Sequence, residues 1–280
     1  MSEAAGFSSE VLSIEKNGPV GTLWMDRPEK YNAMNPAMWR GLPGAMQALT
    51  ADGDVGAIVL SAKGKHFSVG LDLVSAQSGG DGTLGGSLSG AAANLKQLEV
   101  TRAFQAAISS IADSPVPVIA AIHGYCLGAG VDVATACDIR LAAKDSTFSI
   151  RETKIGIVAD VGTLQRLPKI VTAGHVAELA YTGKDIDAAR AEKIGLLNDV
   201  HADAESTYQA AFEMAMEIAN NAPLAVRGTK FVLSQSEDLT TEQSLLLNGI
   251  WTMITTLNSN DLKEAMTAFM EKRPPQFKGE

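Results

Sequence analysis

The sequence predicts an α/β fold that is followed by a helical C-terminal region. In the first 200 residues, short apolar runs alternate with stretches of helical spacing, which indicates layers of strands and helices. The last 80 residues show an almost entirely helical pattern. Only 5% of the 280 residues are aromatic, whereas 46% are hydrophobic and 20% are charged. We therefore expect a globular chain with a sizeable core of aliphatic side chains and alanine.

The N-terminal elements follow from turn and capping signals. Two short strands are expected at Val11–Lys16 and Val20–Asp26, because the intervening Asn17–Pro19 has the composition of a hairpin turn. A helix is expected over residues 36–50, since it starts with proline and is preceded by Asn35, a favourable N-cap.

The next elements are separated by glycine and proline. The apolar, β-branched run Val55–Ser61 predicts a buried strand. Residues 75–90 are rich in glycine and serine, so we expect a mobile loop there. A helix over Asn94–Ala112 ends before two prolines, and the strand Val118–Ile122 follows them.

A tight turn over Gly124–Gly130 then leads into an expected helix at Val131–Ala136 and a strand at Ile139–Ala142. After Gly162 the pattern is mostly helical. Val116–Ala136 is the longest stretch of low charge, but it contains a histidine, an aspartate and three glycines. We interpret it as buried core and not as a membrane span.

The acidic balance of the chain limits its partners. It has 23 Lys and Arg residues against 32 Asp and Glu residues, which gives a formal net charge of −9. Nucleic acids are bound by basic faces, so no nucleic-acid partner is expected, and no membrane partner is expected either. The net negative charge is still compatible with a small polyanionic ligand, because such a ligand needs only a local cluster of basic residues.

The cysteines and the two ends of the sequence bear on the compartment. Cys126 and Cys137 do not make a disulfide scaffold and favour a reducing environment. The first ten residues, MSEAAGFSSE, lack a basic region followed by an apolar one, and Phe277–Glu280 does not match a peroxisomal address. We therefore expect a cytoplasmic location. The four histidines show no metal-ligand spacing, so no metal site is expected.

Two glycine-containing turns are the first candidates for chemistry. His66–Leu73 and Leu127–Asp132 each follow an expected strand, and the second opens a helix. Backbone N–H groups at a helix N-terminus have no intrahelical acceptor and stabilise negative charge, so two such turns brought together would form an oxyanion hole. The simpler alternative is that the glycines only permit tight turns. A dinucleotide fingerprint is disfavoured, because Val133 stands where the third glycine belongs.

Three acidic residues are candidates for proton transfer: Asp132, Glu152 and Asp160. The first and third have mainly small or apolar neighbours in the sequence, which is unusual for solvated acids. A carboxyl group in an apolar wall has a raised pKa and becomes a workable acid or base near neutral pH. For each acid alone, the alternative is that it caps a helix or pairs with an arginine. The candidate arginines are Arg140, Arg151 and Arg166.

Four segments of the chain, taken in order, match a known family. They are Met25–Met34, Phe67–Leu73, Pro117–Arg140 and Phe148–Pro168. Through them the chain resembles the crotonase superfamily, the enoyl-CoA hydratase/isomerase group, over nearly its whole length. The resemblance implies a crotonase-type spiral of repeated ββα units with an acyl-CoA site over residues 1–200. It also implies a helical trimerisation region over residues 201–280 and assembly as a homotrimer or a dimer of trimers.

The same resemblance implies roles for the turns and the acids. The backbone N–H groups of Val69 and Ala129 would form the oxyanion hole, with alanine at the second position in place of the family's usual glycine. The combination of Asp132, Glu152 and Asp160 resembles the dienoyl-CoA isomerases. Enoyl-CoA hydratases usually have glutamate at the first of these three positions and glycine at the third.

The implied reaction is the isomerisation of 3,5-dienoyl-CoA to 2,4-dienoyl-CoA in fatty-acid β-oxidation. It removes a proton at C2 and adds one at C6. The resemblance gives the first step to Asp160 and the second to Glu152, while Asp132 orients or polarises the site. A 2-enoyl-CoA hydratase, which uses two acids to activate one water, is the alternative. A non-catalytic acyl-CoA-binding or RNA-binding protein on the same fold is disfavoured by the three acids and the acidic balance.

Substrate contacts are implied by the resemblance at the same turns and near the C-terminus. Arg27 and Lys30 are candidate contacts to the phosphates of CoA, and the alternative for each is a solvated surface charge. The other implied substrate contacts are Ala33, Gly70, Leu71, Asp72, Leu73, Gly130 and Lys272, assisted by Arg273 and Lys278. Because CoA is part of the substrate, no separate cofactor is expected.

Overall fold

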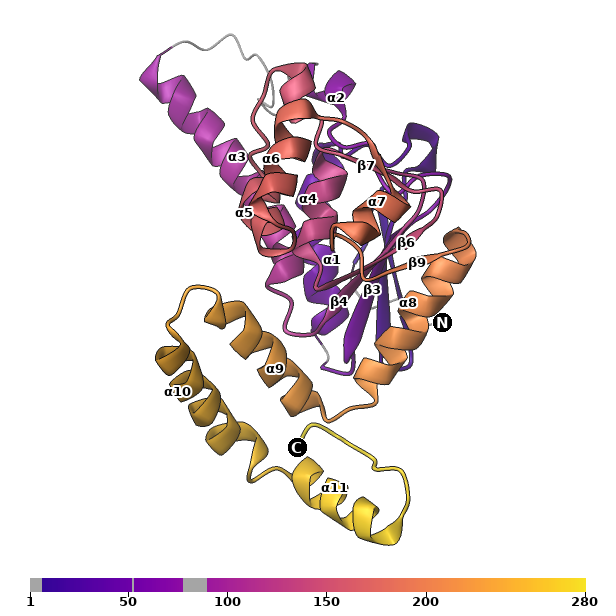
Figure 1. The fold of residues 1–280 in the computed structure, drawn as a ribbon, viewed down its shortest axis with the longest axis vertical. Helices are drawn as coiled ribbons and strands as arrows, with labels where there is room; N and C mark the ends of the chain where they lie inside the picture. The colour runs from indigo at the N-terminus through magenta and orange to yellow at the C-terminus, as the bar shows by residue number, and fades with distance from the viewer. Residues whose placement is uncertain (1–6, 52, 78–89) are drawn as a thin grey trace.

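The computed structural model describes residues 7–51, 53–77 and 90–280, and its framework is a six-stranded sheet (Figure 1). In spatial order its strands are β1 (Leu12–Asn17), β2 (Val20–Met25), β3 (Ala57–Ala62), β4 (Val118–Ile122), β6 (Ile139–Ala143) and β9 (Asp199–His201). β1 and β2 form an antiparallel hairpin, and all the other neighbouring pairs are parallel. Because β3 and β4 are parallel, the segments that follow them leave the sheet at the same edge.

A second, three-stranded sheet stands at that edge. It contains β5 (Tyr125–Leu127), β7 (Thr147–Ser149) and β8 (Ile186–Asp187). β5 pairs in parallel with β7, and β7 pairs in antiparallel fashion with β8. This small sheet carries the turn after β4 and the segment after β7 side by side.

The central strands β3 and β4 of the large sheet are buried on both faces, and their residues are almost all apolar. In β3, Ile58 and Leu60 join the core beneath α1 (Pro36–Thr50), α3 (Ala91–Ala112) and α4 (Ala129–Ala136). The alternating residues Ala57 and Val59 face the opposite way, against α8 (Ala204–Ala219). Figure 1 shows α8 on one side of the sheet and α1, α3 and α4 on the other. Strands covered on both sides read as continuous apolar runs, as β3 and β4 do.

Short helices complete the core. They are α2 (Leu73–Gln77), α5 (Thr163–Arg166), α6 (Ala173–Thr182), α7 (Ala188–Lys193) and the 3-10 helices η1 (Pro28–Lys30), η2 (Glu152–Ile155) and η3 (Leu167–Lys169).

The last helices form an arm that extends away from the sheet (Figure 1). The arm consists of α9 (Pro223–Ser236), α10 (Thr241–Trp251), the π-helical segment η4 (Thr252–Thr256) and α11 (Asn260–Glu271). Its large apolar side chains are exposed, with Phe269 82% and Met270 80% accessible. Among the helices that the structure describes, none has the length and apolar character that a membrane crossing requires.

The structure confirms the α/β class, the N-terminal hairpin and the first helix. Asn35 caps α1 as expected, since its side chain accepts a hydrogen bond from the Met38 N–H. Helix α3 starts three residues earlier than expected, at Ala91, and α4 starts at Ala129 instead of Val131. The expected loop over residues 75–90 lies largely outside the described residues; its first three residues end α2.

Four short strands were not expected from the sequence. They are β5, β7, β8 and β9, each of two or three residues. Such short strands carry too little periodicity to be recognised, and their existence depends on pairing with distant segments. Helix α8 falls within the predicted C-terminal region, yet it covers one whole face of the sheet.

Candidate active site

The two glycine turns lie against each other. The N–H groups of Phe67 and Ser68 donate to the carbonyls of His123 and Tyr125 at 2.8 and 2.9 Å, and Leu127 donates back to Ser68 at 3.0 Å. The segments after β3 and β4 therefore run side by side. The simple turn-forming alternative does not account for this contact between two turns that are far apart in the sequence.

Gly70 is the point of closest approach between the two turns. Its φ of +90° is in the left-handed region, and a Cβ there would lie 2.8 Å from the Leu127 carbonyl oxygen and 3.2 Å from the Ala129 nitrogen. Any larger residue would push the turns apart. Gly70 is thus required by both its backbone conformation and its surroundings.

Three backbone N–H groups at this contact have no acceptor within the part of the chain that the structure describes. They belong to Leu71, in the first turn, and to Ala129 and Gly130, the first residues of α4. The first two N–H groups flank the contact at Gly70. They form a pair of donors suited to a developing oxyanion, at the positive end of a helix.

The backbone N–H of Val69, predicted as the first donor, already has a hydrogen-bond acceptor. Its N–H donates to the Tyr31 carbonyl at 3.2 Å, so the fold itself occupies this group. Leu71, predicted only as a substrate contact, has the unoccupied N–H.

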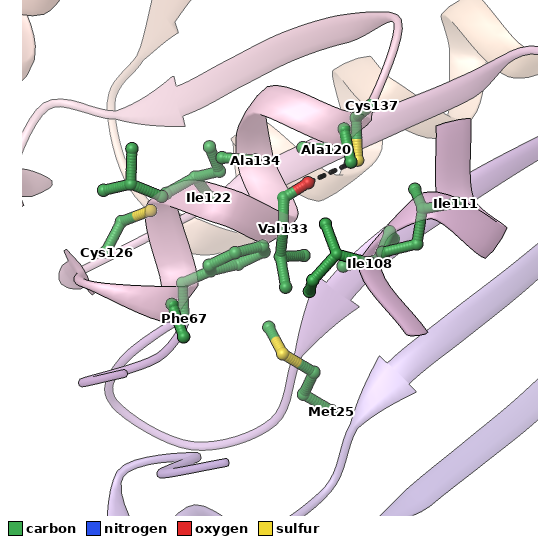
Figure 2. Packing of buried hydrophobic residues seen from close by; sticks show 14 of the residues in the cluster. Met25, Phe67, Ile108, Ile111, Ala120, Ile122, Cys126, Val133, Ala134 and Cys137 are labelled. Carbon is green, nitrogen blue, oxygen red and sulfur yellow. Dashed lines mark hydrogen bonds between the residues drawn. The ribbon is translucent and has the colours of Figure 1, made fainter. Parts of the chain in front are cut away.

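Helix α4, which carries Ala129 and Asp132, packs into the core through its apolar residues. Figure 2 shows Val133 among Phe67, Ile108 and Ile111, with Cys137 donating to the Val133 carbonyl. The buried Arg140 donates to the Cys137 carbonyl at 2.6 Å, at the C-terminal end of α4. A positive charge there complements the helix dipole.

None of the three candidate arginines makes a hydrogen bond to a candidate acid. Arg140 donates only to backbone carbonyls, including that of Leu196. Arg151 pairs with Asp185 at 2.7 Å, and Arg166 donates to Ser109 at 2.9 Å. No direct ion pair therefore joins a candidate arginine to a candidate acid, although the charge of Arg166 acts on Asp132.

Asp132 is fully buried on α4. Its Oδ1 accepts hydrogen bonds from both the N–H and the O–H of Thr163, at 2.5 and 2.7 Å, and its Oδ2 has no partner. Burial raises the pKa of Asp132 to about 7; the negative charge of Glu152 adds to the rise, while the Thr163 hydrogen bonds and the charge of Arg166 oppose it. This carboxyl group therefore changes its charge near neutral pH.

Glu152 and Asp160 lie on the irregular segment that follows β7. Glu152 starts η2, and its Oε1 lies 3.3 Å from the position that a Cβ on Gly128 would take, beside the start of α4. Burial raises the pKa of Glu152, and the negative charge of Asp160 raises it further. Partial burial also raises the pKa of Asp160, which is an exposed residue. Glu152 thus interacts electrostatically with Asp132 and with Asp160, although the environments of the three acids differ.

Arg27 and Asp72 form an ion pair beside the first turn. The Arg27 Nη1 donates to Asp72 Oδ2 at 2.7 Å and to the Ala33 carbonyl at 2.9 Å. Burial raises the pKa of Asp72, but hydrogen bonds from Ser75 and Arg27 and the Arg27 charge outweigh it and hold the pKa at about 2. Three of the predicted CoA contacts therefore bind one another.

Asn32 is a further organising residue that the sequence analysis did not single out. It is fully buried with a φ of +54°; its amide nitrogen donates to the carbonyls of Lys63 and His66, and its Oδ1 accepts from the Arg27 N–H at 2.8 Å. It ties the segment after β2 to the segment after β3. Its signal in the sequence was its place inside the first matched segment.

The other predicted substrate contacts divide into two groups. Lys30 and Leu73 are exposed near the first turn, while Lys272, Arg273 and Lys278 follow α11, the last helix of the arm, which lies away from α4 in Figure 1. Arg273 is occupied by Glu264 and Glu271. A single chain does not bring the arm and the turns together. The described residues also contain no cluster of three His, Cys, Asp or Glu side chains able to hold a metal ion.

Comparison with known proteins identifies close relatives. The chain is 40% identical to the mitochondrial Delta(3,5)-Delta(2,4)-dienoyl-CoA isomerase of Dictyostelium discoideum, covering 95% of this chain and 91% of the relative. It is 39% identical to the peroxisomal Delta(3,5)-Delta(2,4)-dienoyl-CoA isomerase of Arabidopsis thaliana, covering 96% of each.

These relatives contradict the expected cytoplasmic location. Both are named for an organelle, one for mitochondria and one for peroxisomes. The expectation depended on the absence of recognisable address signals at the ends of the sequence, and an absence of that kind carried no positive information.

The fold and the family agree with these relatives. The structure matches the crystal structure of an enoyl-CoA hydratase from Bacillus anthracis with a TM-score of 0.87 at 27% identity, covering 97% of this chain and all of the other. The family model described as enoyl-CoA hydratase/isomerase matches residues 15–280. The chain therefore belongs to the enoyl-CoA hydratase/isomerase family, the crotonase fold.

Proposed function

We propose that this protein isomerises 3,5-dienoyl-CoA to 2,4-dienoyl-CoA, as a step of fatty-acid β-oxidation. The observation that carries the proposal is the pair of unoccupied backbone donors on adjacent turns, with the Glu152 carboxyl group beside the start of α4 and interacting electrostatically with Asp132 and Asp160. The names of the relatives at 39–40% identity support the same reaction. No cofactor besides the CoA of the substrate is required.

The proposed oxyanion hole is formed by the N–H groups of Leu71 and Ala129. The thioester oxygen gains negative charge when C2 loses its proton, and these donors would stabilise that dienolate. Removing one donor of this kind typically costs about 3 kcal/mol of barrier. The methyl group of Ala129 leaves the backbone donor intact.

The proposed proton transfers use two differently placed acids. Asp160, exposed and ionised more easily than Asp132, removes the proton at C2. Glu152 is more buried, its pKa is raised by burial and by the charge of Asp160, and it delivers the proton to C6. Asp132, on α4, lies close enough to Glu152 for their charges to interact. Two acids at separate positions suit a reaction whose proton leaves one carbon and arrives at another four bonds away.

The proposed CoA contacts follow from the same geometry. Lys30 is exposed and suited to a phosphate, while Arg27 acts through Asp72 and Ala33 to hold the first turn. The exposed apolar side chains of α10 and α11 support the proposed assembly as a homotrimer or a dimer of trimers. In such an assembly Lys272 would reach CoA only from a neighbouring subunit.

The proposal is tested with two substrates given to one enzyme preparation. We expect a rise in conjugated-dienoyl absorbance with a 3,5-dienoyl-CoA, and a much slower hydration of crotonyl-CoA. Efficient hydration without isomerisation would replace the proposal with the hydratase alternative. The matched control is Lys30→Ala, which should raise KM for both substrates without changing their ratio.

A further inference from the structure

The hydrogen-bonding groups around Asp132 are unequally distributed between its two oxygens. Oδ1 accepts two hydrogen bonds, both from Thr163, at 2.5 and 2.7 Å. Oδ2 is buried and has no partner. An oxygen that already accepts two hydrogen bonds is a poor site for a proton, so a proton bound by this carboxyl group resides on Oδ2.

A second buried oxygen without a partner belongs to Glu152. Its Oε2 is inaccessible and makes no hydrogen bond, while its Oε1 lies beside Gly128 at the start of α4. The charge of Glu152 acts on Asp132. A protonated Oδ2 needs an acceptor and an ionised Oε2 needs a donor, so each group supplies what the other lacks.

We propose that Thr163 is a positioning residue for the reaction, because it fixes Oδ1 of Asp132 and thereby makes Oδ2 the oxygen that donates a shared proton to Oε2 of Glu152. This inference rests on the proposed function for its kinetic consequence. When Glu152 has delivered its proton to C6, the neutral Asp132 donates a hydrogen bond to the carboxylate that remains. The pair therefore stabilises the charge that proton delivery creates.

The neighbouring residues fix the position of Thr163. It is 1% exposed, and the preceding Gly162 has a φ of +136°, where a Cβ would collide with the guanidinium of Arg166. The side chain of Arg166 also donates to the Val161 carbonyl. The chain is thus forced to present the Thr163 N–H and O–H toward α4.

The groups that act on Asp132 are known from each neighbouring element. Glu152 on η2 raises its pKa, Arg166 and Thr163 on α5 lower it, and the buried Cys126 on β5 is close enough to be affected by its charge. Removing the Thr163 hydroxyl takes away one of the influences that lower the pKa. The pKa of Asp132 should then rise.

The first test is spectroscopic and needs no substrate. Infrared difference spectra between low and high pH should show the C=O band of a protonated carboxyl group that titrates near pH 7 and is absent in Asp132→Asn. The titration should move to higher pH in Thr163→Val and return in Thr163→Ser. Absence of the band in the wild type, or the same titration in Thr163→Val, would overturn the inference.

The second test is kinetic. In Thr163→Val, kcat should fall about 10-fold with KM within about twofold, since a hydrogen bond to a carboxyl group is lost but the binding surface is kept. The alkaline limb of the kcat profile should move to higher pH, and Thr163→Ser should restore both. Equal losses in Thr163→Val and Thr163→Ser would indicate a merely structural role. An enzyme without isomerase activity whose infrared band behaves as expected would refute the proposed function and leave standing the assignment of Asp132 Oδ2 as the donor to Glu152.

Discussion

The candidate site contains two regions that give an aspartate carboxyl group different surroundings. On α4, Asp132 is fully buried in a rigid helix with one oxygen held by Thr163. On the irregular segment after β7, Asp160 is exposed, and its backbone carbonyl is bound by Gln105 of α3 at 2.7 Å. Two aspartates of equal intrinsic acidity thus acquire different roles from their surroundings. The buried Asp132 is suited to hold a proton on one oxygen, and the exposed Asp160 is suited to exchange a proton with substrate.

The largest expected effect belongs to the exposed side of this comparison. Asp160→Asn removes the proposed base without changing the shape of the site, and general bases contribute about 100-fold or more to rates. We expect kcat for 3,5-dienoyl-CoA to fall at least about 100-fold, with KM little changed. Steady-state kinetics measures this, with circular dichroism as the control for folding. An unchanged rate would remove Asp160 from the mechanism.

The contact between the two turns gives the next largest effect. Gly70→Ala forces a Cβ to within 2.8 Å of the Leu127 carbonyl oxygen at a positive φ. We expect kcat to fall by about 10- to 100-fold, because the two donors are moved apart, and stability to fall by about 1–3 kcal/mol. Kinetics and urea denaturation measure the two changes. Gly249→Ala, on α10 with no atom within 4 Å of its Cβ, is the matched control and should leave activity unchanged.

The buried aspartate should lower stability above neutral pH. Its pKa is about 7 in the folded state against 3.8 unfolded, so the folded state binds more protons and stability declines as pH rises from about 4 to 7. Asp132→Asn removes this penalty, which is up to about 4 kcal/mol. Urea denaturation at pH 8 should show the variant to be more stable and less active. A variant less stable than the wild type at pH 8 would contradict the assignment.

The ion pair between Arg27 and Asp72 should make stability depend on pH in the opposite direction. The pKa of Asp72 is about 2 when folded against 3.8 unfolded, so its contribution is present above about pH 4 and is lost as pH falls toward 2. We expect Asp72→Asn to lose about 2 kcal/mol at pH 7, with the difference shrinking at pH 3. Denaturation curves at the two pH values measure it. A difference that does not depend on pH would exclude the ionic contribution.

The smallest effect is expected at Ala129. Ala129→Gly restores the residue usual in the family and keeps the backbone N–H, so kcat should change by no more than about twofold, while added chain entropy costs about 0.5–1 kcal/mol of stability. The same kinetic assay applies. A large gain in kcat would show that the alanine methyl group crowds the thioester.

Much of this molecule could be predicted from local signals. Asn35 and the proline after it define the start of α1, and the apolar run 118–122 defines β4. The acids were found because their neighbours in the sequence are small or apolar. These features depend on residues that are close together in the chain.

What could not be predicted depends on contacts between distant residues. Val69 was predicted as a donor from the resemblance, and the sequence alone cannot show that the Tyr31 carbonyl accepts a hydrogen bond from the Val69 N–H. Thr163 lies 31 residues from Asp132, and Asp72 lies 45 residues from Arg27. The short strands β5, β7 and β8 exist only through pairing with segments that are distant in the sequence. Hydrogen bonds of this kind appear only when the fold is known.

The most direct test of the account is to follow the proton. The reaction of 3,5-dienoyl-CoA is run in D2O, and the product is examined by mass spectrometry and NMR. Proton delivery by a solvent-exchanged Glu152 predicts a 2,4-dienoyl-CoA that has gained no water and carries deuterium at C6. A product that has gained water, with deuterium at C2 and none at C6, would contradict the account.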